Sequence, residues 1–358
     1  MAEKIIAGHA ALDDLDRFCR AVLTAHGASP ASVDAIARAL MHATRLGVDS
    51  HGVRLLEHYV LEMSEGRVLK TPDVRVTNAF GAVATVDGGG GHGALATFTG
   101  MEKAVEIART MGIGAVGVRH GSHFGAAGAY ALAAARAGFI GYCVCNSDKL
   151  VKLHGGAERF HGTNPHAWAM PVKGQNPWLL DMATSSIPYN RVNLYRSTGE
   201  RLPAGTGADK HGEPTQNAHD AVMLTPLGGE DFGFKGAALA GVAEILSSVV
   251  NAMELSHELL PMREGMEHRR PMGAFVMAIS PHAFAEGDAV DATMQRYLDA
   301  LRGTPTVPGE TVMAPGDREW KVEAEREQHG VPIDPVTARA FADMAARFSV
   351  QAPHIAAA

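Results

Sequence analysis

Two short stretches of the sequence carry side chains of the kind that hold and react with a small acid. The first is DSHGVRLLEHY, residues 49–59. If Ser50 caps a helix here, the cationic side chains that follow share one face, because they are three and four residues apart. These residues are His51, Arg54 and His58. Arginine grips a carboxylate through two parallel hydrogen bonds, and a helix N-terminus favours an anion. The stretch predicts a carboxylate site, with a solvated polar face as the alternative.

The second stretch, GSHFGAAGAY, puts His123 in a glycine-rich loop between an expected strand and an expected helix. Glycine lets a ligand approach closely, and imidazole titrates near neutral pH, so His123 is a candidate general acid or base. An ordinary loop histidine is the alternative. Asp181 ends an apolar strand, where it could orient a catalytic histidine or cap the next turn. By themselves His161, Thr163 and Asn164 form an ordinary turn.

Two glycine-rich stretches match the dinucleotide fingerprint G-x-G-x-x-G. The match at 112–117 follows a helix rather than a strand, so we interpret it as a helix end and a closely packed strand. The match at 88–93 lies between a strand and a helix, where a helix N-terminus would favour a phosphate. However, the next strand ends in Arg119 and His120 instead of an acidic residue. A nucleotide loop and a flexible strand-to-helix turn both stay open there.

The sequence has 18 histidines, which raises the question of a metal site. It contains no H-E-x-x-H motif and no Cys/His pairs at zinc-finger spacing. His154, His161 and His166 are close in sequence but irregularly spaced. We therefore expect no metal, and a metal-dependent hydrolase is only a remote alternative.

Composition narrows the class of protein. The net charge is −7 and no basic block occurs, so we expect no nucleic-acid partner. The start of the chain lacks the apolar core of a signal peptide, and no run of about 18 apolar residues predicts a membrane span. Cys19, Cys143 and Cys145 are too few for a disulfide framework, and the last two are typical of buried strand thiols. We expect a cytoplasmic protein that acts on small molecules.

The elements that must position these side chains follow from apolar periodicity. Residues 1–70 predict helices, one of them capped by Ser29 with Pro30 in its first turn, and another beginning near Ser50. Strands are expected in 74–87 (two), 113–120, 139–147, 167–172, 178–183 and 273–280. Helices are expected in 94–112, 127–138 and 235–253, and again after about 288. Residues 190–230 are rich in Gly, Pro, Thr and Asn and are expected to be loop.

Taken together and in this order, the motifs resemble the malate/L-lactate/sulfolactate dehydrogenase family, also called the type-2 malate/lactate dehydrogenases. This family includes ureidoglycolate dehydrogenase and Δ1-piperideine-2-carboxylate reductase. The resemblance extends over nearly the whole chain and is carried by DSHGVRLLEHY, GIGAVGVRHGSHFGAAGAY, LHGG, HGTNP, LLDMATSS, FKGAALAGVAEIL, GAFVMAIS and PGDRE. The resemblance implies an α/β fold with a non-Rossmann NAD(P)-binding domain and a mixed β-sheet at 73–287. It also implies a homodimer, and helical segments at 1–72 and 288–358 that pack with each other.

The implied reaction is hydride transfer between NAD or NADP and C2 of a small 2-oxo or 2-hydroxy acid, such as malate, lactate, sulfolactate or ureidoglycolate. The alternative is a reductase of a cyclic or N-alkyl imino acid such as Δ1-piperideine-2-carboxylate. The implied proton donor is His123, and His51 with Asp181 behind it is a close second. The implied substrate-binding residues are Ser50, Arg54 and Tyr59. The implied cofactor-binding residues are Ser147, His161, Thr163, Asn164, Asp181, Met182, Ala183, Lys235, Pro315, Gly316 and Asp317.

The chain also departs from the family pattern. Residues 148–150 are Asp-Lys-Leu where apolar residues and proline are more usual, Ala237 replaces the tyrosine of K-G-Y, and Asp317 replaces the usual acid of P-G-E. The stretches ADKHGEPTQNAHDA and MELSHELLPMREGMEHRRPMG differ as well. These departures leave the implied reaction type intact and leave the substrate and the choice between NAD and NADP open.

Overall fold

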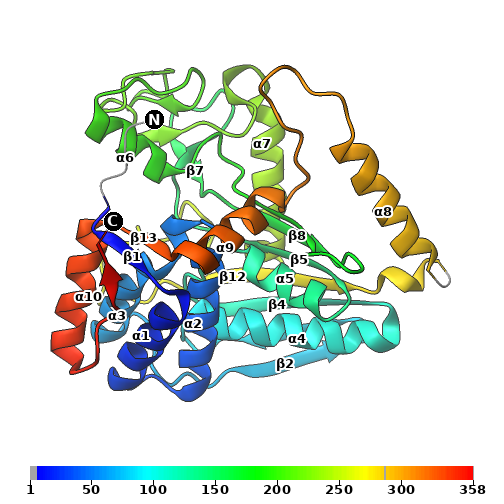
Figure 1. Ribbon diagram of the computed structural model, residues 1–358, viewed down its shortest axis with the longest axis horizontal. Coiled ribbons are helices and arrows are strands. Elements are labelled where there is room, and N and C mark those ends of the chain that lie inside the picture. Colours follow the sequence, from blue (N-terminus) through cyan, green and yellow to red (C-terminus); the bar gives the residue numbers. More distant parts are fainter. Residues whose placement is uncertain (1–5, 286–287, 358) are drawn as a thin grey trace.

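The largest element of the computed structural model is a seven-stranded mixed sheet (Figure 1). The structure describes residues 6–285 and 288–357. The strand order is β2-β3-β4-β12-β5-β8-β9. Their bounds are β2 Arg75–Phe80, β3 Val83–Asp87, β4 Ile113–Gly121, β12 Met272–Ile279, β5 Ile140–Cys145, β8 His166–Met170 and β9 Trp178–Met182. Within the described ranges, β3 and β4 are the parallel pair of this sheet and the other neighbours are antiparallel. Each strand was predicted at its place in the sequence.

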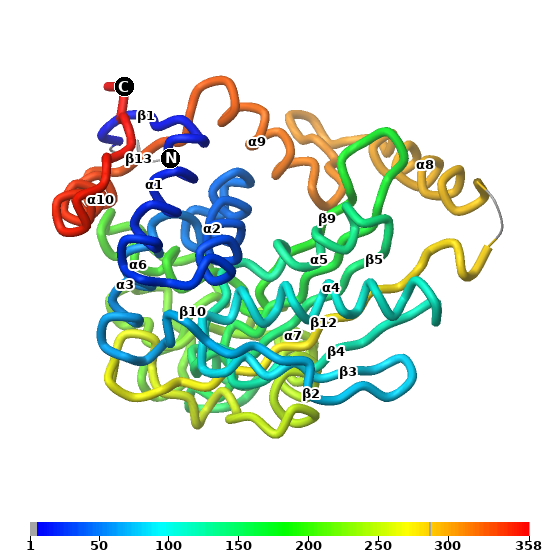
Figure 2. The backbone as a smooth tube through the Cα atoms, turned by 90° about the horizontal axis from the view of Figure 1, so that it is seen from below, coloured from blue at the N-terminus to red at the C-terminus, as the bar shows by residue number. Residues whose placement is uncertain are grey.

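Helices cover both faces of this sheet (Figure 2). On one face lie α4 (Gly93–Met111) and α5 (Gly128–Arg136), with α2 (Pro30–Arg45) over them, and their shared core is rich in alanine and valine. On the other face lie α7 (Gly229–Glu244) and the π-helical turn η3 (Ile245–Val249), which pack on β5 and β12. The small side chains of this core let the backbones of helix and sheet approach closely.

The glycine motif at 112–117 belongs to this packing. Gly112 is the left-handed C-cap of α4, with φ of 79°. A Cβ atom on Gly114 would lie 2.2 Å from the carbonyl oxygen of Ala104, and one on Gly117 would lie 2.0 Å from Oδ1 of Asn251. The prediction of a helix end followed by a packed strand is therefore confirmed.

The two ends of the chain meet in a small three-stranded sheet. Strand β1 (Gly8–Ala10) pairs with β13 (Val331–Ile333) on one side and β14 (Ile355–Ala356) on the other. One hydrophobic cluster joins α1 (Leu12–Ala25), α2 and α3 (Leu56–Ser64) to α10 (Pro335–Phe348). These elements lie side by side in Figure 1, at the left of the view. Ser29 caps α2 as predicted, because its hydroxyl accepts a hydrogen bond from the backbone N–H of Ser32.

Other parts of the C-terminal segment lie elsewhere. Helix α8 (Ala289–Arg302) packs against the β8–β9 hairpin through Leu298 and Leu301, which contact Val172 and Trp178. Helix α9 (Asp317–His329) runs from that hairpin back to the N-terminal helices. The predicted domain boundary at 287 and 288 touches residues 286–287, which lie outside the described residues, as do residues 1–5 and 358. The three-segment division stays a prediction.

Residues 151–224 form a third group of elements. The four-stranded sheet β10-β11-β6-β7 comprises β10 (Gly207–Ala208), β11 (Met223–Leu224), β6 (Val151–Lys152) and β7 (Arg159–His161). Helix α6 (Tyr189–Thr198) packs on it through Val192, which is fully buried. The expectation of loop over 190–230 is wrong for α6. The helix buries little apolar surface besides Val192, so it shows no apolar stripe to detect.

The prediction of one helix beginning near Ser50 is also wrong. Residues Asp49–His51 and Val53–Leu55 form two 3₁₀ turns, η1 and η2, and the α-helix begins only at Leu56. Gly52 separates the turns with an extended backbone, φ −87° and ψ −154°. His51, Arg54 and His58 therefore do not share one α-helical face.

The continuous helix Gly229–Val249 needs separate mention. Among the described residues, it is the one helix long and apolar enough to cross a membrane, by length and composition only. A single helix of this kind is weak evidence for a membrane span, because core helices of globular proteins meet the same criteria. Its apolar face is partly exposed in the single chain, as described below.

Candidate active site

Most of the chemically interesting residues lie along one edge of the seven-stranded sheet. Gly121 at the end of β4 is opposite Met272 at the start of β12, and Cys145 at the end of β5 is opposite Ala274, two residues along β12. Farther along, His166 at the start of β8 is opposite Met182 at the end of β9. The loops that leave these strand ends must therefore lie next to one another. They carry His123, Ser147, Thr163, Asn164 and Ala183.

His123 is the centre of a group of aromatic side chains. The hydroxyl of Tyr59 is 2.8 Å from Nδ1 of His123, which joins α3 to the loop after β4. The ring of His51 stacks on that of His123, with 5.7 Å between the centroids. His92, at the N-cap of α4, meets the Tyr59 ring edge to face at 4.2 Å. The two histidines predicted from separate motifs are thus brought together with the predicted Tyr59.

We call this group of rings the recess, because two of its members, His51 and His123, are not fully buried. His51 and His123 each keep partial contact with solvent, although protein atoms surround them. Burial lowers the pKa of His51 and lowers that of His123 well below its ordinary value, and for His123 the charges of His51 and Arg270 add to the effect. Both imidazoles are therefore neutral at pH 7, which suits a proton acceptor.

Tyr59 can set the tautomer of His123. Burial raises the pKa of Tyr59 well above its ordinary value, and Glu62 contributes, so the phenol keeps its proton. Nδ1 of His123 is the hydrogen-bond partner of this hydroxyl among the described residues. If the hydroxyl oxygen accepts a hydrogen bond from Nδ1–H, the neutral ring keeps a free lone pair on Nε2, which can accept a proton.

Other residues of the first motif point in different directions. Ser50 lies 2.9 Å from Nδ1 of His51 through its hydroxyl. Arg54 is half-exposed, and its Nε lies 3.5 Å from a carboxylate oxygen of Asp334 at the N-cap of α10. The prediction that Arg54 lies on a shared helix face with His51 is therefore wrong. In the single chain this guanidinium belongs to an ion pair at the surface.

Asp181 lies near the end of β9. It accepts a hydrogen bond of 2.8 Å from the backbone N–H of Gly128 in the first turn of α5. Its carboxyl contacts solvent, yet the protein atoms around it raise its pKa to about 6, helped by Glu319. Among the described residues no hydrogen bond joins Asp181 to either His51 or His123. Its predicted role behind His51 stays a prediction.

The residues of the HGTNP motif form a tight polar cluster with Ser147. The Ser147 hydroxyl accepts from the N–H of Thr163, and Oδ1 of Asn164 accepts from the N–H of Ser147. Asn164 is fully buried and donates to Glu244 at 2.8 Å and to the carbonyl of Ala240 at 3.2 Å. Asn164 is thus fixed by the protein, whereas Ser147 and Thr163 keep partial exposure.

The remaining cofactor candidates fall into three places. Met182 and Ala183 lie at the sheet edge and are partly exposed. The Pro315–Asp317 turn contacts the start of β9, since the N–H of Leu179 donates to the carbonyl of Pro315. His161 is buried on β7, and burial lowers its pKa. Lys235 is exposed on α7, where its ammonium lies 5.3 Å from the ring centre of Phe232.

A buried polar network behind Tyr59 was not predicted as a group. Glu62 is 1% exposed, and its two carboxylate oxygens have no hydrogen-bond partner within the described chain. His58 approaches it at 3.4 Å and Arg67 at 3.8 Å. Nε2 of His92 is likewise buried without a partner among the described residues. Of these four residues the sequence singled out only His58, because the others carry no motif and meet through long-range contacts.

His42 of α2 lies beside a predicted site residue, and the sequence did not indicate it. A Cβ atom on Gly128 would lie 2.7 Å from a carboxylate oxygen of Asp181 and 3.1 Å from Nε2 of His42, so these two side chains are neighbours. Burial lowers its pKa to about 3, so it is neutral. Within residues 6–285 and 288–357, no group of three or more His, Cys, Asp or Glu side chains could hold a metal ion.

Comparison with known proteins adds three findings. Residues 10–342 match the model of a family described as malate/L-lactate dehydrogenase. A malate dehydrogenase of Pyrococcus abyssi is 34% identical over 328 residues, which cover 90% of each chain. A (2R)-3-sulfolactate dehydrogenase (NADP(+)) of Chromohalobacter salexigens is 30% identical over 319 residues, which cover 88% of this chain and 92% of that protein. Relatives also include a ureidoglycolate dehydrogenase (NAD(+)) and a Δ(1)-pyrroline-2-carboxylate reductase.

The fold is shared as well. The crystal structure of malate dehydrogenase from Entamoeba histolytica superimposes with a TM-score of 0.90 at 27% identity, covering 97% of this chain and 99% of that one. The similarity therefore extends over the mixed sheet, the layers of helices and the recess at the sheet edge.

Proposed function

Because the chain belongs to the malate/L-lactate dehydrogenase family, we propose that it transfers a hydride between a nicotinamide and C2 of a small 2-oxo or 2-hydroxy acid at the recess of His51 and His123. The chain is an oxidoreductase that uses NAD or NADP. The observation that carries the assignment to this recess is the 2.8 Å contact between Tyr59 and His123 beside the stacked His51.

His123 moves the proton in this proposal. In the direction of oxidation, neutral His123 carries its proton on Nδ1, which donates to the Tyr59 oxygen, and its Nε2 accepts the hydroxyl proton of the substrate. In the direction of reduction, the resulting imidazolium returns the proton to the substrate oxygen. Two features support this role: the Tyr59 hydroxyl can act as either donor or acceptor, and the recess keeps the resting imidazole neutral. His51, held by Ser50, is the second candidate.

Residues along the sheet edge would hold the dinucleotide. When bound, the nicotinamide supplies or accepts the hydride. The chemistry of the edge fits such a group, because Ser147, Thr163, Met182 and Ala183 are partly exposed, whereas fully buried Asn164 holds their loop in place. The predicted roles of His161, Asp181, Lys235 and the Pro315–Asp317 turn are part of the proposal. A non-Rossmann site is supported by the sheet, whose parallel pairing is limited to β3 and β4 in the described ranges.

Substrate binding is proposed for Ser50, Arg54 and Tyr59. Arg54 would have to leave Asp334 to reach a carboxylate in the recess. Breaking this ion pair costs little free energy, because an exposed ion pair of 3.5 Å contributes about 0–1 kcal/mol to stability.

The test is steady-state kinetics with NADH and NADPH against pyruvate, oxaloacetate and Δ1-piperideine-2-carboxylate. We expect His123→Ala to lower kcat by about 10²–10⁴-fold, the usual contribution of a general acid or base. Tyr59→Phe should lower kcat less than His123→Ala does, because the imidazole remains and loses only its hydrogen-bond partner. His219→Ala, which alters an exposed histidine, is the control. The assignment fails if His51→Ala and His123→Ala both keep the kcat of the wild type.

An imino-acid reductase is the second candidate. The low pKa values of both histidines favour it, because a protonated imine brings its own proton and needs no imidazolium. In that case Δ1-piperideine-2-carboxylate would be the preferred substrate, and His123→Ala would change its kcat only slightly.

We also propose that the enzyme is a cytoplasmic homodimer. Six apolar side chains on the α7–η3 helix are between 41% and 58% exposed in the single chain: Phe232, Phe234, Leu239, Val242, Ile245 and Val249. Such a face is unusual on a monomer and supports a second copy as its partner. The free, buried thiols of all three cysteines support a reducing compartment.

A further inference from the structure

A buried acid lies behind the pair of Tyr59 and His123, and the proton transfer described above does not use it. Glu62 is 1% exposed, and neither of its carboxylate oxygens has a hydrogen-bond partner within the described chain. A buried polar atom without a partner destabilises a protein, and a charged one does so more strongly. Such a group in a folded protein calls for an explanation, and its neighbours point to one.

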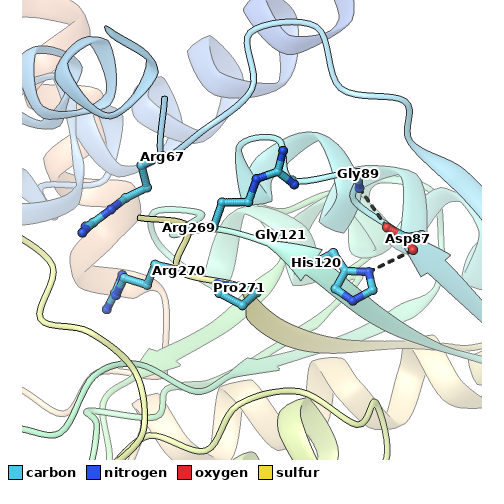
Figure 3. A pocket seen from close by; sticks show the side chains of 9 residues that line it. Arg67, Asp87, Gly89, His120, Gly121, Arg269, Arg270 and Pro271 are labelled. Carbon is cyan, nitrogen blue, oxygen red and sulfur yellow. Dashed lines mark hydrogen bonds and ion pairs between the residues drawn. The ribbon is translucent and has the colours of Figure 1, made fainter. Parts of the chain in front are cut away.

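Arg67 keeps this acid ionised. Its guanidinium lies 3.8 Å from Glu62 and donates to three backbone carbonyls within residues 262–268. Arg67 borders a cavity of about 430 Å³, but its side chain is 0% exposed and its guanidinium points away from Gly89 in the cavity wall (Figure 3). A guanidinium stays charged in proteins, and a buried cation needs a negative partner. Among the described residues, the carboxylate within 4 Å of Arg67 is that of Glu62.

The charge of Glu62 acts on Tyr59. Both residues belong to α3 and are three positions apart, so their Cβ atoms lie about 5–6 Å from each other on one face of the helix. Burial raises the pKa of Tyr59 well above its ordinary value, and the charge of Glu62 is the second cause. The phenol of Tyr59 therefore experiences a negative potential from its own helix.

The other ionisable groups around Glu62 add little charge at Tyr59. His92 packs on the Tyr59 ring but is neutral, because burial lowers its pKa to about 3. His58 lies 3.4 Å from Glu62 on the same helix. The remaining charged groups on this side lie around Arg67: Glu267, Asp148 and Arg270. Among the charges of the described residues, that of Glu62 is the one that contributes to the raised pKa of Tyr59.

We propose that Glu62 is a positioning residue for the proton transfer, because through Tyr59 it holds the ring proton of neutral His123 on Nδ1. The 2.8 Å contact between Tyr59 and His123 allows either partner to donate. The negative carboxylate attracts the hydroxyl proton of Tyr59, and a lone pair of the phenol oxygen then faces His123. Nδ1–H of His123 donates to that lone pair, and Nε2 is left free to accept a proton.

The same charge stabilises the imidazolium. The inference rests on the proposed function here, because that function makes His123 the proton acceptor. When the O–H bond of the substrate breaks, an N–H bond forms at Nε2 and His123 gains one positive charge. Glu62 neither gains nor loses a proton. Its negative charge attracts the imidazolium in buried surroundings, where electrostatic interactions are stronger than in water.

The test is ¹⁵N NMR of the histidine side chains at pH 7.5, on the full chain without substrate. The signals of His123 are identified by their absence from the spectrum of His123→Asn. We expect the wild type to carry the ring proton on Nδ1. Glu62→Gln keeps the shape of the side chain and removes its charge. It should shift the ratio of the two tautomers about three- to ten-fold toward Nε2–H, at an effective dielectric constant of about 20.

Glu65→Gln is the matched control. Glu65 is an exposed acid at the C-cap of the same helix, so its loss should leave the tautomer of His123 unchanged. Glu62→Asp keeps the buried charge and should keep the tautomer of the wild type. A purely structural role of the side chain would instead make the Asp and Gln variants behave alike.

Steady-state reduction of pyruvate and oxaloacetate gives a second readout. Glu62→Gln should lower kcat about three- to thirty-fold, because the imidazolium that gives the proton is less stable. KM for the 2-oxo acid should stay within about two-fold of the wild type, because Glu62 is buried behind Tyr59 and does not contact the substrate. Glu62→Asp should keep most of the wild-type kcat.

Three results would overturn the proposal. A wild type with the ring proton of His123 on Nε2 would exclude it without any variant, and this result is decisive even if Glu62→Gln does not fold. An unchanged tautomer ratio in folded Glu62→Gln would show that the carboxylate does not set the tautomer. Equal changes in Glu62→Gln and Glu62→Asp would assign the effect to packing instead of charge.

Failure of the proposed function is a separate outcome. It follows if the wild type oxidises neither NADH nor NADPH with any 2-oxo or imino acid. The NMR comparison needs no substrate, so it still decides whether Glu62 sets the tautomer of His123.

Discussion

At the scale of single residues, the recess is built to keep imidazoles neutral. Burial is the leading cause of the lowered pKa of His42, His51, His92 and His123. A folded state that holds neutral histidines binds fewer protons than the unfolded chain below pH 6.5, so acid must weaken it. The same property that prepares His123 to accept a proton therefore limits stability at low pH.

His92 allows this link to be measured. Its pKa is lowered to about 3, and its Nδ1 accepts the N–H of Ala94 as the N-cap of α4. The contribution of neutral His92 to the free energy of unfolding is fully present above pH 6.5 and is lost as the pH falls toward 3. His92→Asn keeps a good N-cap but does not titrate. We expect it to reduce the pH dependence of unfolding by up to about 1.4 kcal/mol per pH unit between pH 6 and 4.

The measurement is the urea midpoint at pH 7.5 and at pH 5, followed by tryptophan fluorescence. His219→Asn alters an exposed histidine and is the control. An unchanged difference between the two pH values in His92→Asn would show that His92 does not contribute to acid sensitivity.

At the scale of elements, the sequence predicted what repeats locally and missed what depends on distant contacts. The strands of the large sheet were found because Val, Ile and Ala alternate or run together, as in β4 and β12. Helix α6 was missed because it buries Val192 and almost nothing else. The helix expected at Ser50 is broken by the extended Gly52, whose Cβ would lie 2.6 Å from Oγ1 of Thr44 on α2.

The same division holds for the site. His51, Tyr59 and His123 were identified from motifs, and the structure brings them together. The predicted position of Arg54 was wrong, because the prediction assumed a continuous helix that Gly52 interrupts.

The G-x-G-x-x-G match in β4 gives a prediction at this scale. Gly114→Ala places a Cβ atom 2.2 Å from the carbonyl oxygen of Ala104 and 2.9 Å from Cβ of Ile107, so α4 must shift. We expect a loss of about 1–3 kcal/mol in the free energy of unfolding, the usual cost of overpacking. KM for NADH and NADPH should stay within the range of the wild type. Chemical denaturation measures the expected loss of stability, and steady-state kinetics measure KM.

Gly241→Ala is the control for that variant, because no atom lies within 4 Å of its Cβ position on α7. It should be neutral or stabilise by up to about 1 kcal/mol. A Gly114→Ala protein of normal stability that binds NADH weakly would contradict the packing interpretation. It would instead favour a nucleotide-binding loop at residues 112–117.

At the scale of the whole molecule, the α7–η3 helix is the feature that a single chain leaves incomplete. It packs on β5 and β12 through Ala243 on one side and exposes a row of large apolar side chains on the other. A second copy of the chain would cover this row, and so would a lipid surface. Only the first alternative predicts a particle of twice the mass of one chain in solution without detergent.

Ile245→Asp tests the dimer. Ile245 is 52% exposed near the middle of this row, and a buried, unpaired carboxylate would destabilise an interface strongly. We expect light scattering after gel filtration to give twice the mass of one chain for the wild type and the mass of one chain for Ile245→Asp. Leu194→Asp, on 42% exposed Leu194 of α6, should leave the mass unchanged. A dimer that survives Ile245→Asp would exclude this face as the interface.

The small sheet β13-β1-β14 has a consequence for how the protein folds during its synthesis. During translation strand β1 is made long before both of its partners. At about 5–20 residues per second, roughly 20–70 s of translation separate them. During that time the apolar residues of α1 and α2 lack the cover of α10. The nascent chain is therefore a natural client for a chaperone that binds its N-terminal helices until synthesis ends.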